Sequence, residues 1–529
     1  MEVLLVSIVI ILAVLANKIS DKIGLPSLLL FIVLGIIFGM TGLFDNKFSN
    51  FVVGEKIASI SLIAIMFYGG FGTNWKMARP VARESIILST LGVFFTAVFI
   101  TIFCTYILKF DIRESFLLGS VVASTDAASV FSILRSKNLN LKYNSASLLE
   151  VESGSNDPMA YMLTIVALSL ITGSEVSVFR LIFTQFFFGI VNGVIMSYVL
   201  MFILRRNSFE QDGFLTIFVF AITLFTYAIT NQLNGNGYLA VYIFGIIIGN
   251  KDFQGKRDLV HFFDGFTGLM QIAVFFLMGL LSSMDQLIAS FGVAAIIMIF
   301  MTIVARPLAV FGLLAPFRSP LNQKIVVSFA GLRGAAAIAF AMMVVMSDAV
   351  ISMDIFHIVF GICLLSSFVQ GSFLPWISKK YDMIDDTDTV LKTFNDYTEE
   401  GELNFIKVLV DEKSKQVGRT VGDLDFELNN LLIPMINRNG TPIIPKGDTE
   451  ILEGDIIVLS GEAYTDRTGS ELKEYIITND DPWANKQIKD INISNRELVV
   501  IIRRSDGEIV VPDGMTTIYP NDSVIVSNI

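Results

Sequence analysis

Apolar residues fall in about thirteen long runs over the first 376 residues, with short polar stretches between them. Each run approaches the roughly 20 residues that a helix needs to cross a bilayer. The pattern predicts a polytopic α-helical membrane protein with about 13 spans. The runs lie near residues 3–19, 26–44, 55–73, 85–108, 114–134, 146–172, 178–204, 213–231, 236–249, 259–281, 286–314, 323–346 and 354–376.

Composition and loop charge extend this prediction. Of the 529 residues, 53% are apolar and only 16% are charged, too few charges for an ordinary soluble protein. Loops after odd-numbered spans carry fifteen Lys or Arg residues, whereas loops after even-numbered spans carry five. The positive-inside rule therefore predicts an outside amino terminus and a cytoplasmic tail. The first run lacks a basic leader and a small-residue cleavage pattern, so we expect it to be a retained span.

The tail differs in charge and contains a repeat. Residues 1–380 have a net charge of +4 and residues 381–529 have −15. At an offset of 67 residues, Asn439-Gly440 aligns with Asp506-Gly507 and Asp455 with Asp522. Short β-rich runs flank both Gly turns, which indicates hairpins. We expect a transmembrane domain at 1–380, a linker at 381–402, and two α+β lobes at 403–462 and 470–529.

The lobe sequences resemble the C-terminal lobe of RCK (TrkA-C) domains, from Ile436 through Thr449 and at Glu453-Gly454-Asp455. The resemblance implies that lobes pair and bind a small regulator, such as cyclic di-AMP. Asn437, Arg438 and Ile444 are then the candidate contacts; alternatively, the two polar residues only solvate a turn. No Gly-x-Gly-x-x-Gly precedes the lobes, which argues against direct control by NAD or ATP.

Two predicted spans carry buried acidic groups. Thr125-Asp126 lies in the fifth span and Asn156-Asp157 in the sixth. A carboxylate at bilayer depth costs roughly 2.5–3.5 kcal/mol on insertion scales, so it indicates an ion or proton path. Asp157 is the first candidate, because one carboxylate can hold either H⁺ or a cation. Asn156 and Thr125 add neutral oxygens, the ligands that hard cations prefer, and Asp126 shapes the site or neutralises a helix end.

The remaining intramembrane charges suggest supporting roles. Glu152 lies about 140° around the helix from Asp157, so we pair it with Arg306 in a structural ion pair. In the twelfth span, Gly331, Arg333 and Gly334 predict a helix break. The twelfth span comes seven spans after the fifth. Because seven is odd, the two spans cross the membrane in opposite directions, as an inverted repeat requires.

Four motifs together resemble the NhaP-type branch of the monovalent cation:proton antiporters: Ser124-Thr125-Asp126, Glu152 through Pro158, Asn236 through Tyr242, and Gly331 through Gly334. The resemblance implies a homodimer in the cell membrane with broken, crossed fifth and twelfth spans. It also implies electroneutral exchange by the Asn-Asp pair. Ala127, where many members have Pro, and the RCK-like lobes are similar to the K⁺/H⁺ branch, so we favour K⁺ over Na⁺, with a function in K⁺ and pH homeostasis.

Other functions remain as alternatives. A Na⁺/H⁺ antiporter of the same fold would use the same motifs. A K⁺ channel-like permease regulated by RCK lobes is the competitor from another class, but the sequence has no Thr-Val-Gly-Tyr-Gly filter. An intramembrane aspartyl protease would need a Gly-x-Gly-Asp motif, which is missing. We therefore expect a transporter and no enzymatic activity.

Overall fold

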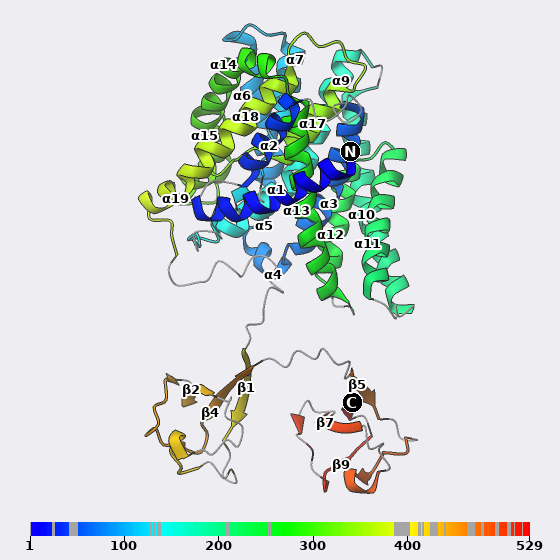
Figure 1. Ribbon diagram of the computed structural model, residues 1–529, viewed down its shortest axis with the longest axis vertical. Helices are drawn as coiled ribbons and strands as arrows, with labels where there is room; N and C mark the ends of the chain where they lie inside the picture. Colours follow the sequence, from blue (N-terminus) through cyan, green and yellow to red (C-terminus); the bar gives the residue numbers. More distant parts are fainter. Residues whose placement is uncertain are drawn as a thin grey trace. The chain divides into compact units, whose positions relative to one another are not determined.

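The computed structural model divides into two compact units, residues 1–397 and 398–529, which we describe separately (Figure 1). The first is helical and the second is built from strands. The structure describes residues 2–23, 27–41, 51–126, 129–130, 133–134, 139–174, 176–206, 212–251, 253, 255–385, 403–410, 414, 417–423, 432–438, 441–462, 471–477, 481–491, 497–504, 509–510, 512, 514–520 and 522–528.

One group of helices, which we call the first bundle, packs through close backbone contacts. A Cβ atom added at Gly35 would overlap the carbonyl oxygen of Phe276, so α2 and α13 approach too closely for a side chain there. Small residues allow such approaches between membrane helices. The first bundle consists of α1 (Glu2–Ile23), α2 (Ser27–Thr41), α3 (Phe51–Gly72), α10 (Val178–Arg206), α11 (Asp212–Gln232), α12 (Gly237–Gly249) and α13 (Lys256–Leu281).

The second bundle holds the remaining helices of this unit and contains the predicted intramembrane charges. Its members pack mainly on one another, and α9, α17 and their neighbours also contact the first bundle. The second bundle consists of α4 (Trp75–Ala78), η1 (Arg79–Val81), α5 (Ala82–Ile87), η2 (Leu88–Gly92), α6 (Val93–Tyr106), α7 (Ile112–Val122), α9 (Ser145–Thr172), α14 (Met284–Phe300), η3 (Met301–Ala305), α15 (Arg306–Leu314), α16 (Leu321–Phe329), α17 (Ala335–Val345), α18 (Ile355–Leu365), η4 (Ser366–Gln370) and α19 (Gly371–Lys380).

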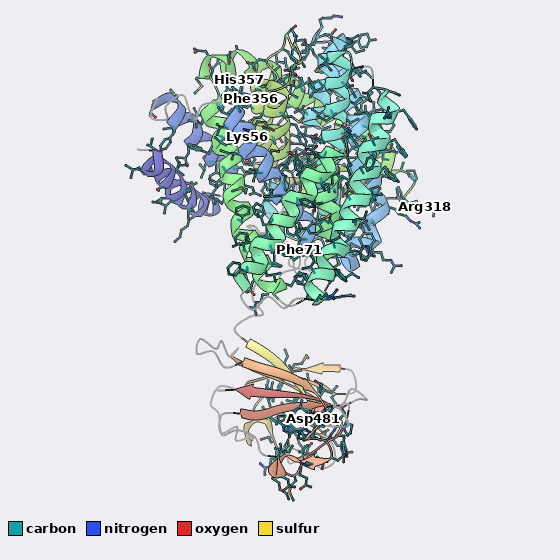
Figure 2. All side chains as sticks on the ribbon, turned by 90° about the vertical axis from the view of Figure 1, so that its right-hand side faces the viewer. Lys56, Phe71, Arg318, Phe356, His357 and Asp481 are labelled. Atoms are coloured by element: carbon teal, nitrogen blue, oxygen red, sulfur yellow. The ribbon has the colours of Figure 1, made fainter. Side chains whose placement is uncertain are left out.

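Helices lie in every apolar run that the sequence analysis identified. Among the described residues, seven helices are long and apolar enough to cross a membrane, and further apolar helices are shorter. The helix is interrupted in two of the runs: α7 ends midway through the run at 114–134, and a break separates α16 from α17 in the run at 323–346. Figure 2 shows His357 and Phe356 toward one end of the helical unit and Phe71 toward the other, as expected for alternating spans. The number of crossings stays a prediction.

The tail consists of two lobes with the same strand order, β1-β4-β2-β3 and β5-β10-β7-β8. The 3₁₀ turns η6 (Val421–Asp423) and η7 (Ile488–Asp490) lie 67 residues apart, as the repeat predicts. The turns at 439–440 and 506–507 lie outside the described residues. The strands are β1 (Leu403–Leu409), β2 (Leu432–Arg438), β3 (Thr441–Ile443), β4 (Ile456–Glu462), β5 (Glu471–Ile476), β6 (Lys486–Gln487), β7 (Glu497–Arg503), β8 (Ile509–Val510), β9 (Thr517–Ile518) and β10 (Ser523–Asn528).

The first residues of the predicted linker are bound to the helical unit. Ile384 forms an antiparallel bridge with Leu141, and the Lys142 N–H donates to the Met383 carbonyl at 2.8 Å. The Lys142 ammonium lies 2.9 Å from Asp382, and this hydrogen bond raises the pKa of Lys142. Met383 is fully buried. Residues 381–385 therefore form an ordered strap against the segment that leads into α9.

Candidate ion-binding site

The site is built where the interruptions of two helices meet. The first, α7, ends at Val122, and residues 123–126 leave the helical conformation. The second break spans residues 330–334, between α16 and α17. The Asp126 N–H donates to the Leu332 carbonyl at 2.9 Å and so joins the two breaks. The described residues thus show breaks in both predicted spans; Ala127 and Ala128 lie outside them.

Opposite charges compensate the two broken helix ends. Arg333, 1% exposed, donates from Nη1 to the carbonyls of Ala123 (2.9 Å) and Ser124 (2.6 Å), at the carboxyl end of α7. The Asp126 carboxylate lies at the amino end of α17, so close to Gly334 that an added Cβ would overlap it. Helix carboxyl ends attract cations and amino ends attract anions. These two charged residues therefore stabilise the breaks.

A hydroxyl-rich pocket surrounds Asp157. The Ser124 hydroxyl donates to the Asp157 carboxylate, which is 6% exposed. The Asn156 amide donates to the Thr125 hydroxyl, and Thr125 Oγ1 lies 2.8 Å from Ser153 Oγ. The structure thus brings together Asp157, Asn156 and Thr125, while Asp126 lies at the helix end.

Two contributors, Ser124 and Ser153, were missed as site residues. Both belong to the motifs singled out in the sequence, but serine is common where membrane helices pack and its hydroxyl carries little signal alone. In addition, Asn156 Oδ1 is buried and has no hydrogen-bond partner among the described residues. Carboxylate, amide and hydroxyl oxygens together form a ligand set suited to a hard cation.

Glu152 and Arg306 form the ion pair that the sequence analysis proposed. The Arg306 guanidinium contacts the Glu152 carboxylate, and both side chains are almost fully buried. The pair links α9 to the start of α15. Gly331 packs beside it, because a Cβ there would lie 3.2 Å from Arg306 Nε. Removing either partner would leave a buried, uncompensated charge.

The candidate regulatory residues lie in the first lobe. Arg438 donates to both oxygens of Asp455 at 2.8 Å and to the Glu450 carbonyl at 2.8 Å. These hydrogen bonds lower the pKa of the Asp455 carboxyl. Ile444 is 86% exposed, and the Asn437 side chain lies outside what the structure describes.

The second lobe repeats this arrangement. Arg504 contacts Asp522 and donates to the Thr517 carbonyl at 2.9 Å. Asp522 and Thr517 lie 67 residues after Asp455 and Glu450. Because both lobes contain such an Arg-Asp pair, the repetition indicates a structural function for Arg438 in the first lobe and for Arg504 in the second.

Comparison with known families gives two matches. The sodium/hydrogen exchanger transmembrane family matches residues 6–380, and the TrkA-C domain matches 405–463 and 472–527. The K⁺/H⁺ antiporter NhaP of Alkalimonas amylolytica is 34% identical over 378 residues, 70% of this chain and 65% of that protein. The K⁺/H⁺ antiporter NhaP2 of Shewanella baltica is 29% identical over 462 residues, 85% of this chain and 79% of that protein.

A solved structure shows the same fold. The sodium proton antiporter MjNhaP1 from Methanocaldococcus jannaschii at pH 8 aligns with a TM-score of 0.66 at 22% identity, covering 72% of this chain and 99% of that one. The two helix breaks that meet, the buried Asn-Asp pair and the family match agree on one architecture. The chain belongs to the sodium/hydrogen exchanger family, with two TrkA-C domains in its tail.

Proposed function

We propose that this protein is a secondary antiporter that exchanges K⁺ for H⁺ by competition at Asp157. The observation that carries the proposal is the buried Asp157 carboxylate beside a free Asn156 oxygen, at the crossing of two charge-compensated helix breaks. A carboxylate in this pocket binds a proton or a partly dehydrated cation, and each displaces the other. The names of the NhaP and NhaP2 relatives support K⁺ as the cation.

The charges around Asp157 support one-for-one exchange. Arg333 is bound to the end of α7, Asp126 lies against α17, and Glu152 is paired with Arg306. Each of these three charges has a fixed structural partner, which favours Asp157 as the group that changes its occupancy. The neighbouring Asn156 is neutral and adds no second proton. One cation then replaces one proton, and the cycle moves no net charge.

Transport assays in liposomes test the ion and the stoichiometry. The purified protein is reconstituted with an internal pH dye, the membrane potential is clamped, and K⁺ or Na⁺ gradients are imposed. We expect K⁺ to drive proton flux that does not depend on potential. Flux driven by Na⁺ alone would replace K⁺ by Na⁺ in the same mechanism. K⁺ movement without proton flux would favour the channel-like alternative.

We further propose that the protein lies in the cell membrane as a homodimer, with the tail in the cytoplasm, and that the tail lobes regulate exchange. The strap at residues 381–385 supports regulation, because it joins the tail to the segment that begins α9. Met383 and Leu141 share an apolar cluster with Leu332, from the second helix break. The strap therefore gives the chain that leads into the tail a path of contacts to the site within the second bundle.

Truncation after residue 385 tests this coupling, since it removes the lobes and keeps the strap. We expect altered pH dependence or K⁺ affinity of exchange; unchanged values would show that the lobes do not regulate transport. Calorimetry with cyclic di-AMP tests the proposed regulator. Ile444→Asp, on an exposed side chain, should weaken binding if this surface contacts the nucleotide.

A further inference from the structure

Asn236 lies just before α12 and is 2% exposed. Its Oδ1 accepts a hydrogen bond from the Leu239 N–H at 3.0 Å, so the side chain caps the amino end of α12. Its own N–H donates to the Gln185 carbonyl in α10 at 3.1 Å. These contacts place Asn236 firmly in the first bundle.

The same side chain also reaches the second bundle. Asn236 Nδ2 donates to the carbonyl of Pro158 at 2.7 Å, and Pro158 directly follows Asp157. A second hydrogen bond, 3.2 Å long, joins Ser155 of α9 to Tyr242 of α12. Both connect the helix that carries the ion-binding carboxylate to the same helix of the other bundle.

Packing around these two hydrogen bonds is incomplete. A cavity of about 290 Å³ lies between η2, α9, α10 and α12, and its lining includes Pro158, Met159, Asn236 and Tyr242. Close packing resists sliding of one helix on another, and a cavity removes part of that resistance. The two hydrogen bonds are therefore directional contacts between α9 and α12 beside this cavity, in addition to the edge-on contact of the Tyr161 and Tyr238 rings at 5.0 Å.

We propose that Asn236 is a positioning residue that stabilises one of two access states through its hydrogen bond to Pro158. The inference rests on the proposed antiport function. Alternating access requires one bundle to move against the other around the bound ion. Because Asn236 belongs to one bundle and Pro158 to the other, this motion breaks their hydrogen bond. The bond thus favours the arrangement seen here and shifts the equilibrium between the two states toward it.

Asn236→Ser separates the two functions of the side chain. Serine is about as good as asparagine at a helix N-cap, so α12 remains capped. It has no amide group to reach the Pro158 carbonyl, so the link to α9 is lost. Asn231→Ser is the matched control, because Asn231 accepts from the Gly237 N–H in the same turn at 3.2 Å and its side chain forms no hydrogen bond to α9 among the described residues.

The measurement is the K⁺ concentration for half-maximal proton exchange, taken from each face of oriented vesicles. Losing a bond made in one state shifts the population toward the other state, which weakens apparent affinity from one face relative to the other. One hydrogen bond corresponds to a change of about two- to tenfold in the ratio of the two values. We expect this shift for Asn236→Ser and an unchanged ratio for Asn231→Ser.

Other outcomes would overturn the inference in recognisable ways. A parallel loss of affinity from both faces would show damage to the ion site, and a lower maximal rate with an unchanged ratio would show a purely structural residue. Tyr242→Phe removes the Ser155 bond, together with the hydroxyl's contact to Thr73 within the first bundle, and keeps the ring. It should shift the ratio in the same direction, which gives a second variant if Asn236→Ser does not assemble. Wild-type protein without K⁺-driven proton flux would contradict the proposed function itself.

Discussion

Replacing Glu152 by Gln should destabilise the membrane domain more than it alters ion affinity. The Glu152 carboxylate contacts Arg306 across α9 and α15, and both side chains are at most 3% exposed. After the substitution, the Arg306 charge stays buried without a counterion. Breaking such a pair typically costs about 3–5 kcal/mol. This cost corresponds to a change of roughly 100- to 3,000-fold in the equilibrium constant for unfolding.

The assay is thermal unfolding of the protein in detergent. The fraction that remains folded after heating is measured as the height of the monodisperse peak in size-exclusion chromatography. We expect Glu152→Gln and Arg306→Gln to lower stability by similar amounts. The double variant Glu152→Gln/Arg306→Met should recover much of the loss, because no buried charge remains unpaired. The reasoning is refuted if Glu152→Gln keeps wild-type stability and selectively abolishes exchange, since Glu152 would then belong to the ion path.

Three further predictions concern the helix breaks and the tail. Gly334→Ala should abolish exchange or assembly because its Cβ would overlap the Asp126 carboxylate, whereas Gly69→Ala, with no atom near the added Cβ, should leave flux unchanged. Arg333→Gln should lower exchange by at least tenfold, measured as initial proton flux in liposomes, because the carboxyl end of α7 loses its cation. The first lobe should lose stability as pH falls below about 4, because its Asp455 has a lowered pKa and stabilises the folded lobe only while ionised. Circular dichroism measured against pH checks this prediction. Asp455→Asn should remove the pH dependence.

Sequence reasoning identified the candidate ion-binding residues because buried charges are costly in a membrane and therefore informative. The need for a cation near Glu152 identified Arg306 correctly, although 154 residues separate them. The glycines around Arg333 located the second break for a similar physical reason, since Gly334 leaves space that the Asp126 carboxylate fills.

Features that depend on three-dimensional contact were missed. Ser124 and Ser153 could not be distinguished from other packing serines, and Asp455, the partner of Arg438, lies 17 residues away, just before β4. The strap at residues 381–385 was predicted as linker, because a short polar stretch gives no sign that Met383 becomes buried. The hydrogen bond from Asn236 to the Pro158 carbonyl could not be predicted from the sequence, because every residue has a backbone carbonyl and the residue type does not reveal which one accepts.

The most direct test of the account compares Asp157→Asn with Asp285→Asn, a carboxylate exposed at the start of α14. Both variants are reconstituted in potential-clamped liposomes, and K⁺-driven proton flux is measured after confirming equal incorporation. The account predicts that Asp157→Asn loses the flux completely while Asp285→Asn retains wild-type rates. Coupled K⁺/H⁺ exchange that persists in Asp157→Asn would contradict competition at this carboxylate.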